Sequence, residues 1–173
     1  MEERPPYRAY VALVGTFVAG LGAVGGFASR RRQAVPEPRA LDLALLGLAT
    51  FKASRTLARD KVASFVREPF VQGPAYDGRE EVPVHDGEFR QAIGELVTCT
   101  RCVGTWVGAS LASVTLLAPR TGRLLTTVLA AGALNDWLQA GFAALTAKPK
   151  PAEASLSYGE GRERPARATK GEP

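Results

Sequence analysis

Hydrophobic residues are gathered into a few blocks along the chain, and charged residues fill the gaps between them. The first block, residues 9–28, holds about twenty residues without a charge, enough for a helix to cross the hydrocarbon core of a bilayer. Tyr7 and Tyr10 lie at one end, where interfacial aromatic residues are common, and Arg30 begins an arginine run at the other. The positive-inside rule therefore predicts a transmembrane helix with its N-terminus outside.

This block has two other possible interpretations. Residues 26–28 resemble the cleavage site of a signal peptide, but the arginine run that follows opposes export. Residues 20–25 match G-x-G-x-x-G, but a dinucleotide site also requires a following helix and a second strand that ends in an acid. The pattern favours close helix packing through Gly22 and Gly26, which have G-x-x-x-G spacing.

Residues 40–68 predict one helix that is apolar first and amphipathic afterwards, and a proline ends it. The apolar part, residues 41–51, is too short to span a bilayer alone. Lys52, Arg55 and Arg59 recur at helical spacing and share one face. The helix therefore either lies at the cytoplasmic interface or spans obliquely with snorkelling basic side chains.

The rest of the chain alternates between polar and apolar stretches. Residues 71–92 are polar and predict a loop, in which we expect His85, the single histidine, to be solvated. Two apolar blocks within residues 99–147 predict a helical hairpin across the membrane, with a tight connection at 119–123. Residues 148–173 combine Pro, Gly and charges of both signs, which predicts a disordered tail.

Together these elements predict an all-α integral membrane protein with about three transmembrane helices, one interfacial amphipathic helix and a disordered C-terminal tail. Its domains are the N-terminal transmembrane helix, 1–32, the membrane domain, 33–147, and the tail, 148–173. The net charge of +5 raises the question of nucleic acid. Because the basic residues flank apolar spans, we expect the lipid bilayer as partner instead, with a homo-oligomer or a membrane protein as a further partner.

Two topologies compete for residues 40–68. If this helix stays at the surface, the chain has three spans, and residues 30–101 and the tail are cytoplasmic. If it spans, the basic stretch 59–101 lies outside. The positive-inside rule favours three spans, a multi-pass location in the cell membrane and an N-terminus outside. The abundance of Arg, Ala, Gly and Pro is typical of a GC-rich bacterial genome.

Cys99 and Cys102, the only cysteines, directly precede an apolar block. Helical spacing puts them on one face, one turn apart, and a cytoplasmic location keeps them reduced. A helix N-terminus and Arg101 favour the thiolate, which is consistent with a redox pair. A zinc site needs two further ligands, which a homodimer could supply. The simplest interpretation is that two small, soft side chains pack at a helix interface.

Asn135 and Asp136 lie in the middle of the last apolar block. A carboxylate at that depth is costly and is normally paired or functional. Its candidate partners are Lys52, Arg55 and Arg59, if their helix dips into the membrane. We expect a polar contact between helices, with a proton or ion path as the alternative, although one acid makes a poor relay.

Several features recur in a recognisable order along the chain. They are an apolar helix ending at Arg55, then Asp60, Arg67 and Pro69, then Gly94-Glu95-Leu96, the Cys99-x-x-Cys102 pair and Trp106. This order resembles an uncharacterised bacterial membrane family, the domain of unknown function 1360, one member of which carries a sporulation label. The similarity covers roughly residues 41–145, and the family pattern has Pro where Thr100 stands. It implies membrane residence and supplies no activity, substrate or catalytic residue.

We therefore expect a non-enzymatic structural or partner-binding protein of a bacterial membrane assembly. The alternative is a membrane thiol-redox or zinc-binding protein that uses Cys99 and Cys102. Zinc is the one cofactor that the cysteine pair suggests, and the sequence offers no nucleophile-base constellation that would make a residue catalytic.

Overall fold

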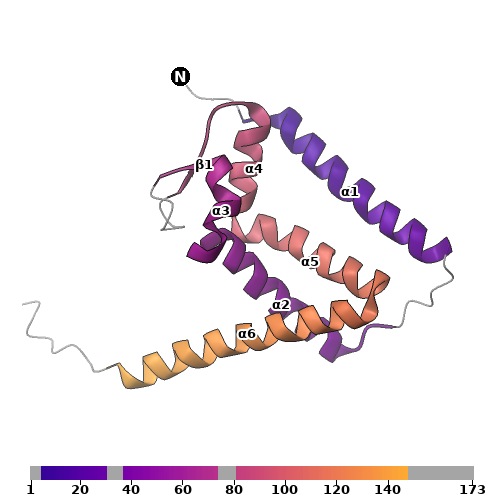
Figure 1. Cartoon of the computed structure of the whole chain (residues 1–173), viewed down its shortest axis with the longest axis vertical. Helices are drawn as coiled ribbons and strands as arrows, with labels where there is room; N and C mark the ends of the chain where they lie inside the picture. The colour runs from indigo at the N-terminus through magenta and orange to yellow at the C-terminus, as the bar shows by residue number, and fades with distance from the viewer. Residues whose placement is uncertain (1–4, 31–36, 74–80, 148–173) are drawn as a thin grey trace, which may run out of the picture. The chain divides into compact units, whose positions relative to one another are not determined.

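The computed structural model describes residues 5–30, 37–73 and 81–147 of the chain (Figure 1). Its elements are α1 (Tyr7–Arg30), α2 (Ala40–Arg59), the 3-10 helix η1 (Lys61–Ala63), α3 (Ser64–Arg67), the 3-10 helix η2 (Glu68–Phe70), β1 (Val71–Gln72), β2 (Val82–Pro83), α4 (Glu88–Thr98), α5 (Thr100–Leu117) and α6 (Pro119–Thr146). The fold is all-α, as the sequence predicts. The chain divides into two units, Met1–Leu138 and Gln139–Pro173. The second contributes the last turns of α6, and the predicted tail at 148–173 lies outside the described residues.

Helix α1 agrees with the apolar helix predicted over residues 9–28. Among the described helices, it is the one whose length and hydropathy suit a membrane crossing, and a signal sequence near an N-terminus shares these properties. Its surface is largely open: Val11, Val14 and Val18 are each more than 60% exposed. Gly22 and Gly26 have nothing within 4 Å of the position a Cβ would take. The close packing expected at these two glycines is therefore absent within the described residues.

The single helix expected over residues 40–68 is interrupted at Asp60. Asp60 has extended backbone angles (φ −81°, ψ 144°), so α2 ends one residue earlier. Its carboxylate accepts a hydrogen bond from Thr56 Oγ1 at 2.8 Å. The guanidinium of Arg67 donates to the carbonyl oxygens of Leu57 (2.7 Å) and Asp60 (3.1 Å). The Arg67 guanidinium thus donates the hydrogen bonds that N–H groups of a further helical turn would otherwise donate to these carbonyl oxygens.

The loop expected over residues 71–92 contains regular structure. Strands β1 and β2 form a short antiparallel pair in which Val71 lies opposite Pro83. Helix α4 then starts at Glu88, directly after Gly87, whose φ of +95° favours glycine. The start was missed because polar residues dominate this stretch, although the apolar positions 89, 92, 93 and 96 have helical spacing.

Two single residues separate the later helices. Cys99, with extended angles (φ −93°, ψ 105°), lies between α4 and α5. Ala118 lies between α5 and α6. Pro119 begins α6, a position where its missing N–H costs nothing. The connection expected at 119–123 is therefore the first turn of α6, while the two helices predicted within 99–147 are present.

Helices α2 and α5 make the most extensive contact between helices. Small residues allow it: the Cβ positions of Gly104 and Gly108 lie 3.6 Å from Ser54 Cβ and 3.3 Å from Thr50 Oγ1, respectively. Ala49 is fully buried on α2. Since the residue number rises along α5 while it falls along α2, the two helices are antiparallel. This interface is the core of the unit, and it was not predicted from the G-x-x-x-G spacing at 104–108.

Helix α1 contacts α4 through one hydrogen bond and α5 through one aromatic contact. Tyr10 Oη donates a hydrogen bond to Glu95 Oε2. Seven residues further along, the rings of Phe17 and Trp106 meet edge to face with centroids 5.0 Å apart. Glu95 lies on α4, ahead of α5, and Trp106 lies within α5, which agrees with the similar direction of α1 and α5 in Figure 1.

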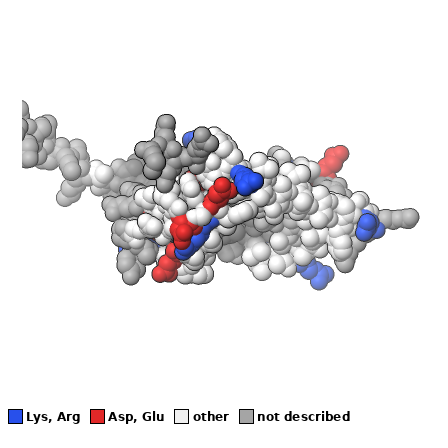
Figure 2. All heavy atoms as spheres, turned by 90° about the horizontal axis from the view of Figure 1, so that it is seen from above, with Lys and Arg blue, Asp and Glu red and all other residues white. Residues whose placement is uncertain are grey.

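Helix α6 turns one face of small residues towards the unit and leaves an apolar face open. Gly122, Thr126, Ala130 and Ala133 are buried at helical spacing. The large apolar side chains of α6 are mostly exposed, including Leu124 (65%) and Val128 (61%). On the face that Figure 2 shows, most of the described surface is uncharged, and charged side chains lie in a few groups.

Candidate functional site at the junction of α2, α4 and α5

Cys99 and Cys102 lie at the start of α5 and are joined as a disulfide, with their Cα atoms 5.2 Å apart. Cys99 is the N-cap of α5, and its sulfur accepts a hydrogen bond from the Cys102 N–H at 3.3 Å. The sequence-based expectation of two thiols one turn apart on a helix is therefore modified, since only Cys102 is within the helix. The reduced state expected for a cytoplasmic pair is also not the state in this structure.

A metal site at this pair would require ligands from elsewhere. Within residues 5–30, 37–73 and 81–147, no three His, Cys, Asp or Glu side chains gather closely enough to hold a metal ion. Cys99 and Cys102 can supply two zinc ligands between them, and a tetrahedral structural site needs four. The zinc prediction thus still depends on a second protomer. His85, exposed in the turn before α4, lies apart from the two cysteines in the sequence and is not grouped with them.

A groove of about 700 Å³ lies beside the cysteine-bearing turn. Its walls are the C-terminal half of α2 and the first residues of α5. It is lined by Phe51, Ser54, Arg55, Arg59, Asp60, Thr100 and Arg101. Three arginines from two helices therefore surround one opening, with a single carboxylate among them.

Asp136 pairs with Lys52 rather than with Arg55 or Arg59, which line the groove. Lys52 Nζ lies 2.8 Å from Asp136 Oδ2, and the two side chains are 25% and 37% exposed. The position of a Cβ on Gly132 would contact the Lys52 stem, and the ring of Trp137 lies edge to face with that of Phe51. The neighbouring Asn135 is exposed and joins none of the described hydrogen bonds.

Arg67 and Glu81 form a buried ion pair that was not predicted. Arg67 is 0% exposed, and its Nε and Nη2 donate to the two Glu81 carboxylate oxygens at 2.6 and 3.0 Å. The remaining nitrogen, Nη1, donates to the carbonyl oxygens of Leu57 and Asp60 at the end of α2. Such a two-pronged geometry suits arginine and not lysine. The sequence signal was the position of Arg67 among the family features, but nothing local identifies a partner fourteen residues away.

Gly94 lets α4 approach η2 and β2 closely. A Cβ on Gly94 would collide with the Phe70 carbonyl oxygen and would lie 3.1 Å from Pro83 Cβ. The next residue, Glu95, accepts hydrogen bonds from Tyr10 and from Gln91 Nε2 (3.1 Å). The Gly94-Glu95 pair therefore fixes α4 against η2 and β2 on one side and links it to α1 on the other.

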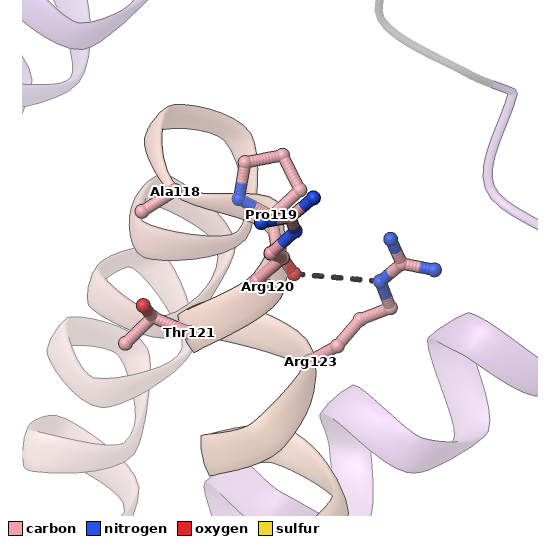
Figure 3. A pocket seen from close by; sticks show the side chains of 5 residues that line it. All are labelled: Ala118, Pro119, Arg120, Thr121 and Arg123. Carbon is pink, nitrogen blue, oxygen red and sulfur yellow. Dashed lines mark hydrogen bonds between the residues drawn. The ribbon is translucent and has the colours of Figure 1, made fainter.

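A second, smaller hollow of about 410 Å³ lies at the start of α6. Figure 3 shows that its lining comes from one turn: the Arg123 side chain folds back so that Nε donates to the Pro119 carbonyl oxygen at 3.4 Å. Arg120 lines the same hollow. Because one helical turn builds it, this hollow brings no distant residues together.

The described elements make this an all-α protein with an apolar N-terminal helix that is long enough to cross a membrane. The chain belongs to the family described as "Protein of unknown function (DUF1360)", whose model matches residues 45–142. This confirms the resemblance found in the sequence, and both α1 and the tail lie outside the matched region. Neither a curated protein nor a solved structure gives a match to the chain.

Proposed function

We propose that the chain is a multi-pass membrane protein with a non-enzymatic, structural or partner-binding role. The observation that carries the proposal is the open apolar surface of two long helices. Val11 and Val18 on α1, like Leu124 and Leu138 on α6, are each more than 60% exposed in the isolated chain. Apolar faces of this extent are rare on soluble monomers and require lipid or another protein to cover them.

We propose four crossings, by α1, α2, α5 and α6, in place of the three predicted with α2 at the surface. The support is the direction of the helices. An N-terminus outside and three spans would make α1 and α5 antiparallel. A parallel arrangement is supported by the contact of Tyr10 with Glu95 on α4, ahead of α5, by that of Phe17 with Trp106 on α5, and by the course of the two helices in Figure 1. With α2 as a span, α1 and α5 cross in one direction and α2 and α6 return.

The orientation follows from the basic residues at the two ends of this arrangement. The end where α2 finishes and α5 begins carries Arg8, Arg55, Arg59, Lys61, Arg67, Arg90 and Arg101. The opposite end carries Arg30, Arg39, Arg120 and Arg123, and the sequence adds Arg31 and Arg32 to this end and Arg79 to the first. The positive-inside rule puts the richer end in the cytoplasm, which gives an N-terminus inside. The region around His85 then stays cytoplasmic, as the three-span model also has it.

Single-cysteine labelling tests the topology. In a Cys99→Ser/Cys102→Ser background, Glu37→Cys and Thr121→Cys should react with a membrane-impermeant reagent in intact cells. Pro5→Cys and His85→Cys should react only after permeabilisation. Labelling of Pro5→Cys and not of Glu37→Cys would restore the three-span topology. Ready labelling of His85→Cys in intact cells would show that this region lies outside and that the orientation is the opposite of the one proposed.

The partner-binding role is supported by the open small-residue face of α1. Gly22 and Gly26 have G-x-x-x-G spacing and no neighbour within 4 Å, so another helix can approach closely there. A photocrosslinking residue at Gly22 in native membranes should yield a defined adduct, either with a second copy or with another protein. The control position Leu111, whose large side chain is buried inside the unit, should yield none. Equal yields from both positions, or none from Gly22, would argue against a helix partner.

A membrane thiol-redox or zinc-binding role is the second candidate. Its support is the adjacency of Cys99 and Cys102 at a helix start, where the dipole favours a thiolate. Thiol counting and metal analysis on purified wild type and Cys99→Ser distinguish the two forms of this role. Two thiols that oxidise reversibly support redox chemistry, whereas half an equivalent of zinc per chain supports a shared four-cysteine site.

A further inference from the structure

We propose that the groove between α2 and α5 binds the phosphate group of an anionic ligand. The groove is lined by Arg55, Arg59 and Arg101, which reach it from two antiparallel helices. Arginine guanidinium groups match phosphate geometrically and remain charged at any physiological pH. The binding inference does not depend on the topology proposed above, although the choice of ligand source does.

Two of the three arginines have charge available for a ligand. Arg55 and Arg101 are exposed, and no described residue forms an ion pair with either side chain. The one carboxylate in the lining, that of Asp60, accepts a hydrogen bond from Thr56 Oγ1 at 2.8 Å. The Asp60 carboxylate therefore offsets one positive charge of the lining, and the charges of Arg55 and Arg101 leave the groove net positive even without Arg59.

The start of α5 adds backbone donors on the same wall. Thr100 and Arg101 are the first two residues of an 18-residue helix, where N–H groups lack partners within the helix. The helix dipole makes this end favourable for an anion. The arginines and the helix start thus attract the same chemical group from different elements.

The groove is larger than one phosphate and is not wholly polar. Its volume of about 700 Å³ leaves room for more than an inorganic ion, and Phe51 contributes an apolar wall. If the four-span proposal holds, α2 ends and α5 begins at the cytoplasmic interface, where the phosphates of anionic lipids lie. A phospholipid head group and a soluble phosphate compound share the chemistry that the groove recognises.

The test uses the full chain purified in detergent and compares two double variants. Arg55→Gln/Arg101→Gln removes two charges from the groove. Arg120→Gln/Arg123→Gln removes the same charge at the other hollow and is the matched control. Native mass spectrometry measures retention of phosphatidylglycerol and of phosphatidylcholine, and calorimetry measures binding of inorganic phosphate. Thermal melting checks that each variant is folded.

We expect wild type and the control to prefer phosphatidylglycerol, and the groove variant to bind it roughly tenfold more weakly, the loss typical of charged hydrogen bonds. Phosphate binding that depends on Arg55 and Arg101 without lipid preference would support the site and identify a soluble ligand. Equal weakening in both variants would mean nonspecific charge attraction and would overturn the proposal. So would a folded wild type that binds neither ligand. Labelling results that reject the four-span topology would leave this binding result unchanged.

Discussion

Two glycine pairs with the same spacing lie in opposite surroundings. Gly104 and Gly108 on α5 face α2, and the Cβ position of Gly108 lies 3.3 Å from Thr50 Oγ1. Gly22 and Gly26 on α1 face open space within the described chain. The spacing G-x-x-x-G indicates that a helix can be approached closely, but it does not say which helix approaches. Helix α5 thus packs inside the unit through its glycines, whereas the glycine face of α1 is open to lipid or to another helix.

The difference extends to how each region is held. The region around α2, α4 and α5 has buried alanines, a close glycine contact and a fully buried ion pair, Arg67 with Glu81. Helix α1 is attached mainly through Tyr10 and Phe17, and most of its length is exposed. Substitutions should therefore cost much in the first region and little in the second.

The largest effect is expected at the buried ion pair. Arg67→Met leaves the Glu81 carboxylate buried without a cation and removes the donor at the end of α2, so the free energy of unfolding should fall by about 3–5 kcal/mol. Denaturant titration of the purified protein measures the change. The double variant Arg67→Met/Glu81→Met should recover part of the loss, because the unpaired charge is gone. A single variant that costs less than 1 kcal/mol would contradict the buried pair.

The second prediction compares the two glycine pairs directly. Gly108→Ile should destabilise by about 1–3 kcal/mol, since its side chain must displace Thr50 on α2. Gly26→Ile, which meets nothing within 4 Å, should change stability by no more than about 0.5 kcal/mol in the purified chain. Both are read from the same unfolding titration. Comparable costs at the two positions would show that α1 also packs through its glycines.

Apolar blocks were enough to predict α1, α2, α5 and α6, because periodicity and length are local properties, whereas α4 was missed among polar residues. The apolar blocks were not enough to predict where α2 ends. The extended angles at Asp60 depend on Arg67, whose guanidinium binds the carbonyl oxygens of Leu57 and Asp60 from outside the helix. A break stabilised by a distant side chain leaves no periodic signal in the sequence.

The partner of Asp136 shows the same limit. Lys52, Arg55 and Arg59 share one helix face, so their spacing could not distinguish them. Arg59 lies about 10 Å further along α2 than Lys52. The pairing of Asp136 with Lys52 depends on the position along α2 at which α6 packs, and this position is set by the tertiary structure. The groove was missed for a similar reason, since its arginines come from α2 and α5.

The third prediction concerns this partly exposed pair. Asp136→Asn leaves Lys52 without a carboxylate, yet the lysine can extend towards the surface, so the loss should be about 1–2 kcal/mol, between the values for exposed and buried pairs. Asn135→Leu is the matched control and should change stability by less than about 0.5 kcal/mol. The charge-swapped variant Lys52→Asp/Asp136→Lys should restore much of the loss. A swap that restores nothing would show that the two charges are not coupled.

The smallest effect is expected where α1 meets α4. Tyr10→Phe removes the hydroxyl that donates to Glu95, while Gln91 remains as a donor to that carboxylate, so the cost should be about 0.5–1 kcal/mol. Tyr7→Phe is the control, because Tyr7 is 67% exposed and its hydroxyl joins none of the described hydrogen bonds.

Trp106 reports on this contact, since its ring meets Phe17 of α1. In a Trp137→Phe background, denaturant titration followed by Trp106 fluorescence should show α1 leaving before the global transition, and Tyr10→Phe should move that early step to lower denaturant. Tyr7→Phe should leave it in place. If α1 instead unfolds together with α2 and α5 in one transition, α1 is as firmly attached as the central helices, and the contrast between the two glycine pairs is a matter of surface alone.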